Sequence, residues 1–216
     1  MKLVATSDTH YPFDASTVPD GDVFILAGDF MYEGTPAEWA PRVASLAALP
    51  HKRKIFVPGN HDYFPFHYRG LARSQLRREA NVTLVDDYEP RFEIEGIKFL
   101  AIPYVTGLHG WAYNREEPQV YQWLCDVTEG YAPDVIISHA PPYQIGDAVG
   151  ASPVNHYGCM AFNKWFYEPG KKPEVWISGH VHDSYGHQRI DRTDFYNVAM
   201  CDEKYKQVNP PMVIEI

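Results

Sequence analysis

Apolar residues in the first part of the chain occur in short runs that end at glycine or acidic residues. Runs of this length between turn signals predict β-strands. Thr35-Pro36-Ala37-Glu38 combines a capping residue, a first-turn proline and an acidic residue, which predicts a helix continuing to about Leu49. The other elements predicted in this part are strands at Lys2–Thr6, Asp22–Ala27, Lys54–Val57 and Val82–Val85 and a helix at Tyr68–Glu79.

The second part of the chain continues the alternation of strands and helices and then changes. The segments Arg91–Glu95 and Ile97–Ile102 surround Gly96 and predict a hairpin. After it we expect helices at Glu116–Glu129 and Cys159–Phe166 and strands at Val135–Ser138 and Val175–Ser178. The C-terminal segments Tyr185–Ile190, Phe195–Ala199 and Met212–Ile216 are predicted to be antiparallel strands. The pattern predicts an α/β fold, a four-layer α-β-β-α sandwich of two mixed sheets flanked by helices, in which every sheet face is covered.

Length and composition fit one compact unit. A chain of 216 residues can bury a single large core, so we expect one domain over residues 1–216. Hydrophobic residues make up 45% and charged residues 22%, and no apolar run approaches the ~20 residues of a membrane span. Asp8 interrupts the N-terminal segment too early for a secretion signal, which indicates a soluble, cytoplasmic protein. Cys125, Cys159 and Cys201 show no paired spacing and are expected to be reduced.

The charge distribution argues against nucleic acid as a partner. The formal net charge is −9, whereas binding to a nucleic-acid backbone needs clustered lysine and arginine. One basic cluster, Arg69, Arg73, Arg77 and Arg78, has near-helical spacing and is interpreted as a solvated helix face. A phosphate-steering patch is the alternative for these arginines.

Potential metal ligands follow directly after the predicted strands. The carboxyl ends of strands in α/β sheets meet at one edge, so side chains far apart in the sequence can converge there. Asp8 and His10, like His180 and His182, are two positions apart and project to the same side of an extended segment. The full set is Asp8, His10, Asp29, Asn60, His61, His139, His180 and His182.

The donor types indicate the class of metal. Imidazoles with carboxylates, an amide and no thiolate suit Mn²⁺, Zn²⁺, Fe or Ni²⁺ better than Ca²⁺ or Mg²⁺. Gly28, Gly59 and Gly179 each stand just before a candidate ligand, where the backbone is expected to turn tightly. Any one of these short motifs alone is weak, but five of them in order, each after a strand, predict a metal centre.

These motifs resemble those of the calcineurin-like metallophosphoesterases, in the order found in that superfamily. The matching segments are Asp8-Thr9-His10, Gly28-Asp29, Gly59-Asn60-His61-Asp62, His139 and Gly179-His180-Val181-His182. Further segments, among them Trp111-Ala112-Tyr113-Asn114 and His139-Ala140-Pro141-Pro142, resemble the MPPED-type branch, which is related to class III cyclic-nucleotide phosphodiesterases. The resemblance covers most of the chain.

The resemblance implies two divalent metal ions, most simply Mn²⁺, with Fe, Zn or Ni as alternatives. One ion would be held by Asp8, His10, Asp29 and His182, and the other by Asp29, Asn60, His139 and His180. Asp29 would then bridge the two ions. A metal-bridging hydroxide would attack phosphorus, and His61 would be the catalytic residue, close to the leaving group without being a ligand.

The second motif departs from the protein phosphatases of the superfamily. They usually continue it as Gly-Asp-x-x-Asp-Arg-Gly, whereas this chain has Gly28-Asp29-Phe30-Met31-Tyr32-Glu33-Gly34. The aspartate that orients the catalytic histidine and the arginine that grips phosphate are both absent. The change weakens a protein-phosphatase assignment and leaves open what orients His61.

Substrate contacts are predicted only from the branch. His109, Asn114 and His156 lie in segments that resemble a nucleotide pocket and are candidate substrate-binding residues. His51, His67 and His187 match no metal motif and are expected to be surface or packing residues. Tyr63, Phe64 and Phe66 are expected to pack beneath the third motif rather than to stack on a base.

The sequence therefore predicts a dinuclear-metal phosphodiesterase acting on a cyclic nucleotide or another small phosphodiester. A phosphomonoesterase is the alternative, followed by a nuclease, for which no basic track is visible. A non-catalytic scaffold is the remaining alternative, although no expected ligand or catalytic residue is missing.

Overall fold

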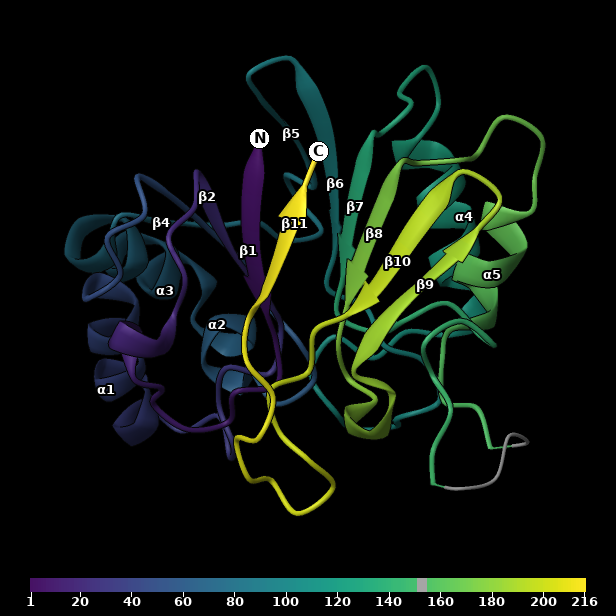
Figure 1. Ribbon diagram of the computed structural model, residues 1–216. Coiled ribbons are helices and arrows are strands. Elements are labelled where there is room, and N and C mark those ends of the chain that lie inside the picture. Colours follow the sequence, from purple (N-terminus) through teal and green to yellow (C-terminus); the bar gives the residue numbers. More distant parts are fainter. Residues whose placement is uncertain (151–154) are drawn as a thin grey trace.

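The computed structural model describes residues 1–150 and 155–216 and contains two sheets packed face to face (Figure 1). The five-stranded sheet has the order β11-β1-β2-β3-β4, and the six-stranded sheet has the order β5-β6-β7-β8-β10-β9. The first consists of β1 (Lys2–Thr6), β2 (Val23–Ala27), β3 (Arg53–Val57), β4 (Val82–Leu84) and β11 (Met212–Glu215). The second consists of β5 (Arg91–Ile94), β6 (Ile97–Ile102), β7 (Val135–Ser138), β8 (Val175–Ser178), β9 (Gly186–Ile190) and β10 (Thr193–Asn197).

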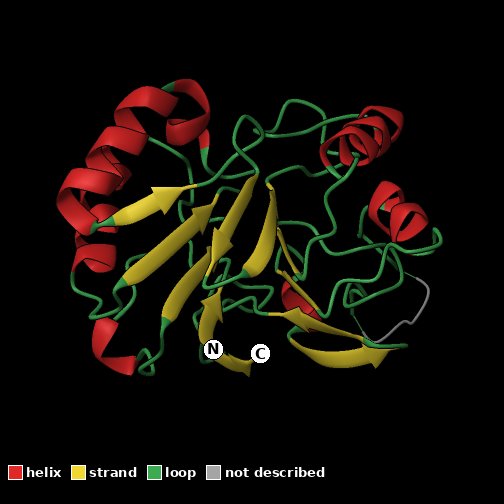
Figure 2. Cartoon of the chain, turned by 90° about the horizontal axis from the view of Figure 1, so that it is seen from above, coloured by secondary structure: helices red, strands yellow, loops and turns green. Residues whose placement is uncertain are grey.

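Helices cover the outer faces of both sheets, as Figure 2 shows from above. The first sheet carries α1 (Pro36–Ala47), α2 (Tyr63–His67), α3 (Arg69–Gln75) and the π-helical turn η2 (Leu76–Ala80). The second carries α4 (Glu117–Val127) and α5 (Met160–Phe166), and short 3₁₀ turns η1 (Ala15–Thr17) and η3 (His182–Ser184) lie in loops. The four-layer prediction is confirmed.

Alternation along the strands creates separate cores on the two faces of each sheet. On β1, Leu3 belongs to the core between the sheets, whereas Val4 packs toward the helices, because successive strand residues face opposite sides. In the second sheet Ile137 faces the first sheet and Trp176 faces the helices. Burial on both faces explains why these strands are almost continuously apolar.

Three local predictions need correction. The helix predicted at Tyr68–Glu79 is α3 followed by a π-helical turn, which ends where Asn81 takes a left-handed conformation with φ 53°. The short helix α2 was not predicted. The strand predicted at Phe195–Ala199 is β10. It is antiparallel to β9, as predicted, but parallel to β8, because the tight β9–β10 hairpin places β10 between β8 and β9.

The arginine cluster is only partly a solvated helix face. Arg69 Nε lies 3.0 Å from Asp86 Oδ2, and Arg73 Nη1 lies 2.9 Å from Glu89 Oε2. Asp86 is fully buried, so these two arginines neutralise a buried carboxylate and join α3 to the segment after β4.

The remaining minor predictions agree with the structure except at Phe66, which is 43% exposed rather than packed beneath the third motif. Cys125, Cys159 and Cys201 are free. His51 is buried against Phe24, whereas His67 and His187 are exposed. Phe64 stacks on Trp39 with ring centroids 4.7 Å apart, Phe66 lies edge-on to Tyr113, and Tyr63 donates to the Gly110 carbonyl.

Candidate active site

The structure brings the candidate ligands together at the carboxyl ends of strands from both sheets. Asp8 and His10 follow β1, Asp29 follows β2 and Asn60 follows β3, while His139 follows β7. His180 and His182 follow β8. We call these seven residues the ligand cluster.

One part of the ligand cluster consists of Asp8, His10 and His182. Each offers one ligand atom, and these atoms lie within 4.8 Å of one another. His182 Nε2 is 3.3 Å from Asp8 Oδ1 and 3.3 Å from His10 Nε2. Asp8 Oδ1 is buried and has no hydrogen-bond partner among the described residues. A cation between these atoms would satisfy it, so the residues fit a metal ion.

The second part contains Asp29, His139 and His180, whose ligand atoms also lie within 4.8 Å of one another. His139 Nε2 is 3.2 Å from Asp29 Oδ2 and 3.0 Å from Asn60 Oδ1. Asp29 also belongs to a third such group, with His10 and His61. The Asp29 carboxylate therefore lies between the two parts of the cluster.

Backbone carbonyls fix the orientation of three histidines in the cluster. Nδ1 of His10, His139 and His182 lies 3.0, 3.0 and 2.8 Å from the carbonyls of Met31, Ala27 and Asp202 respectively. Because Nδ1–H donates to these carbonyls, Nε2 of each ring is left to point into the cluster. This pattern is typical of metal-binding histidines.

Electrostatics in the cluster favour bound positive charge. Burial opposes protonation of His139 and His182, but the carboxylates of Asp29 and Asp8 outweigh it and raise the pKa of each imidazole to about 9. Burial opposes ionisation of Asp8, but its interactions with His182 lower the pKa of that carboxyl to about 2. Burial lowers the pKa of His180 to about 4, which keeps its imidazole neutral, whereas a metal ion bound to His139 and His182 would have to displace their protons.

The backbone of the cluster is strained. Asp8, His10, Asp29 and His180 have φ of 49°, 48°, 51° and 67°, a region that side-chain-bearing residues seldom occupy. Such strain concentrates at functional sites. A Cβ at Gly179 would lie 2.2 Å from Asp8 Oδ2, and one at Gly59 would lie 2.4 Å from Asp29 Oδ1. These glycines permit close packing of the ligand loops, and neither of them is in the left-handed region.

His61 is oriented by a backbone carbonyl. Its Nδ1 lies 2.5 Å from the Tyr32 carbonyl, and its Nε2 lies 4.0 Å from Asp29 Oδ2. Its backbone N–H donates to Asp29 Oδ1. The carbonyl of Tyr32, within the second motif, thus takes the place of the aspartate that this chain lacks.

Two buried ionisable residues that sequence reasoning did not single out hold the ligand loops. Burial and the neighbouring Asp29 raise the pKa of the Asp62 carboxyl to about 8. Asp62 is fully buried and accepts hydrogen bonds from the backbone N–H groups of Phe30, Met31 and Gly59. Arg42, on α1, donates to the carbonyls of Phe30 and His10. The position of Asp62 in the third motif could have indicated its role. Arg42 has no such signal, because in the sequence it looks like any other helix arginine.

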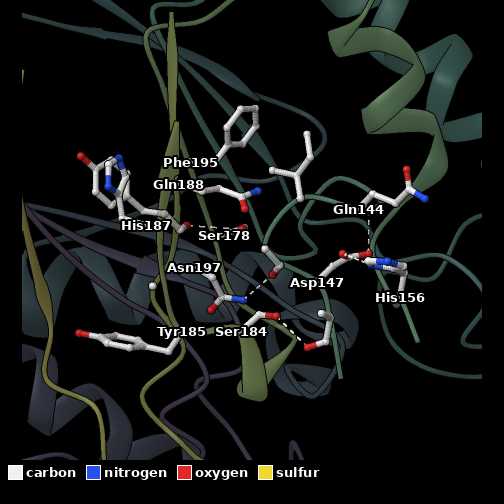
Figure 3. Close-up of a pocket in the computed structure, with 15 residues that line it drawn as sticks. Gln144, Asp147, His156, Ser178, Ser184, Tyr185, His187, Gln188, Phe195 and Asn197 are labelled. Atoms are coloured by element: carbon white, nitrogen blue, oxygen red, sulfur yellow. Dashed lines mark hydrogen bonds and ion pairs between the residues drawn. The ribbon is translucent and has the colours of Figure 1, made fainter. Parts of the chain in front are cut away.

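Asn197 supports the His180 and His182 loop from the end of β10. Its Nδ2 lies 2.9 Å from the Val181 carbonyl and 3.3 Å from the Gly179 carbonyl, and its Oδ1 accepts from Ala199 N–H. Figure 3 shows Asn197 in a polar pocket beside this loop. The pocket has a volume of about 290 Å³.

None of the three candidate substrate-binding residues belongs to the groups of potential ligands. His156 points to Asp147 in the pocket of Figure 3, with Nδ1 2.7 Å from Asp147 Oδ1. Asn114 Oδ1 accepts from Leu108 N–H and so shapes the loop, and His109 is exposed, 3.7 Å from Glu116. None of the three lines the cleft above the cluster, and their contact with substrate stays a prediction.

A cleft of about 350 Å³ opens above the ligand cluster. Its base contains Asp29, Asn60, His61, His180 and His182. Its walls come from three loops, which contribute Trp111, Tyr157 and Tyr205. The Trp111 ring lies 4.7 Å from that of His61, and the Tyr205 ring lies 5.3 Å from that of His182. A molecule that reaches the cluster must therefore pass aromatic side chains.

A two-sheet sandwich with aspartates and histidines gathered after its strands defines a candidate metallohydrolase. The model of the family described as calcineurin-like phosphoesterase matches residues 1–184. Metallophosphoesterase domain-containing protein 1 of Homo sapiens is 28% identical over 243 residues, covering 100% of this chain and 71% of the relative. A UPF0046 protein of Caenorhabditis elegans is 31% identical over 229 residues, covering 100% of this chain and 75% of the relative.

A solved structure shares the fold. Phosphopantetheinyl hydrolase from Mycobacterium tuberculosis superposes with a TM-score of 0.62 at 16% identity, over 94% of this chain and 90% of that chain. The chain belongs to the calcineurin-like phosphoesterase family, as the resemblance of its motifs predicted. Membership indicates a metal-binding phosphoric ester hydrolase. Across residues 1–150 and 155–216, no helix has the length and apolar character needed to cross a membrane.

Proposed function

We propose that this chain hydrolyses small phosphodiesters, among them cyclic nucleotides, with two divalent metal ions. The observation that carries the proposal is the ligand cluster, in which two sets of largely buried donors meet at Asp29. When bound, a pair of divalent ions supplies an activated water as nucleophile and neutralises charge on the phosphoryl oxygens.

The donors support the assignment of each residue to an ion. Asp8, His10, Asp29 and His182 would hold one ion, and Asp29, Asn60, His139 and His180 the other. Imidazole, carboxylate and amide donors without a thiolate favour Mn²⁺, with Fe, Zn and Ni as alternatives. The nearby Cys201 thiol instead contacts the Thr9 carbonyl, which supports a site without sulfur.

His61 would donate a proton to the leaving group. Its Nδ1 proton is held by the Tyr32 carbonyl, so Nε2 is the atom that can carry or donate a proton toward the cleft. The ring also closes one side of the site between His10 and Trp111, with centroids 4.7 Å from each. These contacts support a fixed donor beside the phosphoryl group.

A diester fits the charge of the cleft better than a monoester. A phosphodiester carries one negative charge, whereas a monoester approaches two. No lysine or arginine occurs among the described residues that line the cleft. The second negative charge of a monoester, beyond what the metals neutralise, would therefore lack a protein partner. The neutral ester substituent of a diester can lie against the aromatic walls.

The test compares matched substrates on metal-reconstituted protein. Protein stripped of metal and reloaded with Mn²⁺ is assayed on bis(p-nitrophenyl) phosphate, p-nitrophenyl phosphate and cyclic mononucleotides. We expect higher kcat/KM on the diester than on the monoester, and no turnover without metal. A preference for the monoester would indicate a phosphomonoesterase, cleavage confined to polynucleotides a nuclease, and two bound metals without any turnover a scaffold; each result would overturn the proposal.

A further inference from the structure

The cleft above the ligand cluster has a rim of apolar and acidic side chains. It consists of the apolar residues Leu108, Trp111, Val149, Tyr157, Val181 and Tyr205 together with Asp183 and Glu203. Trp111 is 40% and Tyr157 60% exposed, so these large rings are not packed into a core. Exposed aromatic rings beside a polar site mark a surface that binds a ligand.

The charges of this rim are all negative. Asp183 Oδ2 accepts a hydrogen bond from the Gly150 N–H at 2.8 Å, which fixes its carboxylate at the mouth of the cleft. Glu203 is well exposed and lies 3.8 Å from the ammonium of Lys204, a solvent-exposed pair that neutralises little. No lysine or arginine in the described part of the cleft lining balances these two carboxylates.

Aromatic faces combined with carboxylates form an environment for an organic cation. The ring quadrupole attracts an ammonium group placed over the ring, and the carboxylates add Coulombic attraction. The same groups repel an additional phosphate or carboxylate. Trp111 and Tyr205 lie within 4.7 and 5.3 Å of His61 and His182, so a substituent only a few atoms long can join a phosphoryl group in the cluster to the rim.

We propose that the rim selects phosphodiesters in which one ester substituent carries an ammonium group. This inference rests on the proposed phosphodiesterase function and adds the chemical class of the substituent. Trp111, Tyr157 and Tyr205 surround the cation, and Asp183 and Glu203 supply its counter-charge.

The test uses two substrates that differ only in charge. p-Nitrophenyl phosphocholine carries a trimethylammonium group, and p-nitrophenyl 3,3-dimethylbutyl phosphate carries the neutral tert-butyl group of the same shape. We expect kcat/KM on the choline ester to be about 3- to 10-fold higher at low salt. In Asp183→Asn/Glu203→Gln, where the replaced side chains still accept hydrogen bonds, the ratio should fall toward one. Glu129→Gln, before β7 at the opposite end of the strand from His139, is the matched control and should keep the wild-type ratio.

A binding measurement separates this inference from the proposed function. Calorimetry on Mn²⁺-loaded protein compares phosphocholine with 3,3-dimethylbutyl phosphate, which carry the same phosphate, and should show the same 3- to 10-fold preference in Kd. Absence of turnover on both diesters would contradict the proposed function, whereas this Kd ratio would still test the rim. Equal or weaker binding of phosphocholine, or a preference that survives in the double variant, would overturn the inference.

Discussion

The ligand cluster and the rim surround the same cleft but are built in different ways. Five of the seven cluster residues are buried and the other two are half-buried, all of them follow strands, and three of the four histidines are fixed by backbone carbonyls. The rim comes from loops around Trp111, Tyr157 and Tyr205, far apart in the sequence, and its Trp111 and Tyr157 rings are exposed. Under the proposed function, the rigid cluster would hold the metal ions and the loops would select the substrate. Substitutions in the two regions should therefore fail differently.

The largest expected effect is at Asp29, the residue between the two parts of the cluster. Asp29→Ala removes the ligand proposed to be shared, so metal content and activity should fall together to background. Metal content is measured by elemental analysis and activity on bis(p-nitrophenyl) phosphate. Asp126→Ala, on α4, is the control and should retain both. Two metals per chain in Asp29→Ala would break the assignment of a bridge.

His61 should lose activity without losing metal. If it protonates the leaving group, His61→Ala should lower kcat about 10²- to 10⁴-fold on a cyclic nucleotide, whose alkoxide is a poor leaving group. The loss should be much smaller on a nitrophenyl ester, which needs little protonation. Equal losses on both substrates with metals intact would indicate stabilisation of the phosphoryl oxygens instead. Loss of metal would place His61 among the ligands, as its proximity to His10 and Asp29 allows.

A substitution of Asp62 tests whether its hydrogen bonds to the ligand loops contribute to metal affinity. Asp62→Asn keeps Oδ1, which accepts from the backbone N–H groups of Phe30 and Met31. It places an amide N–H group where Oδ2 of Asp62 accepts from the Gly59 N–H. We expect metal affinity about 10- to 100-fold lower, the usual effect of losing such a partner. Chelator competition measures it. Unchanged affinity would show that the ligand loops hold their shape without this carboxylate.

The smallest effect is expected in the rim. Trp111→Ala should raise KM on an aryl diester about 2- to 10-fold, because one aromatic contact is lost. Metal content should change little, because Trp111 does not belong to the ligand cluster. The kcat on the aryl diester should also change little, because its leaving group needs little protonation from His61, the residue that Trp111 contacts. Steady-state kinetics separate the two parameters. A fall in kcat with KM unchanged would contradict the proposal that the cluster is catalytic and the rim binds substrate.

The same division explains what the sequence could predict. Asp8, Asp29, His139 and His180 stand directly after apolar strands, so their meeting follows from the geometry of parallel sheets. The support of His61 could not be predicted, because the Tyr32 carbonyl that replaces the missing aspartate has no side-chain signature.

Loop and packing features were equally hidden. Tyr205 reaches His182 from a C-terminal loop whose path depends on tertiary structure rather than on local pattern. The π-helical turn after α3 has the composition of an ordinary helix. The parallel pairing of β10 with β8 depends on where the β9–β10 hairpin docks, which strand pattern alone does not determine.

Anomalous diffraction from crystals soaked in Mn²⁺ would show whether two metal ions share Asp29. We predict two anomalous peaks about 3.5–4 Å apart, the usual spacing of such pairs, with the Asp29 carboxylate between them. One peak should be surrounded by Asp8, His10 and His182, and the other by Asn60, His139 and His180. A single peak, or two peaks that do not both contact Asp29, would contradict the account.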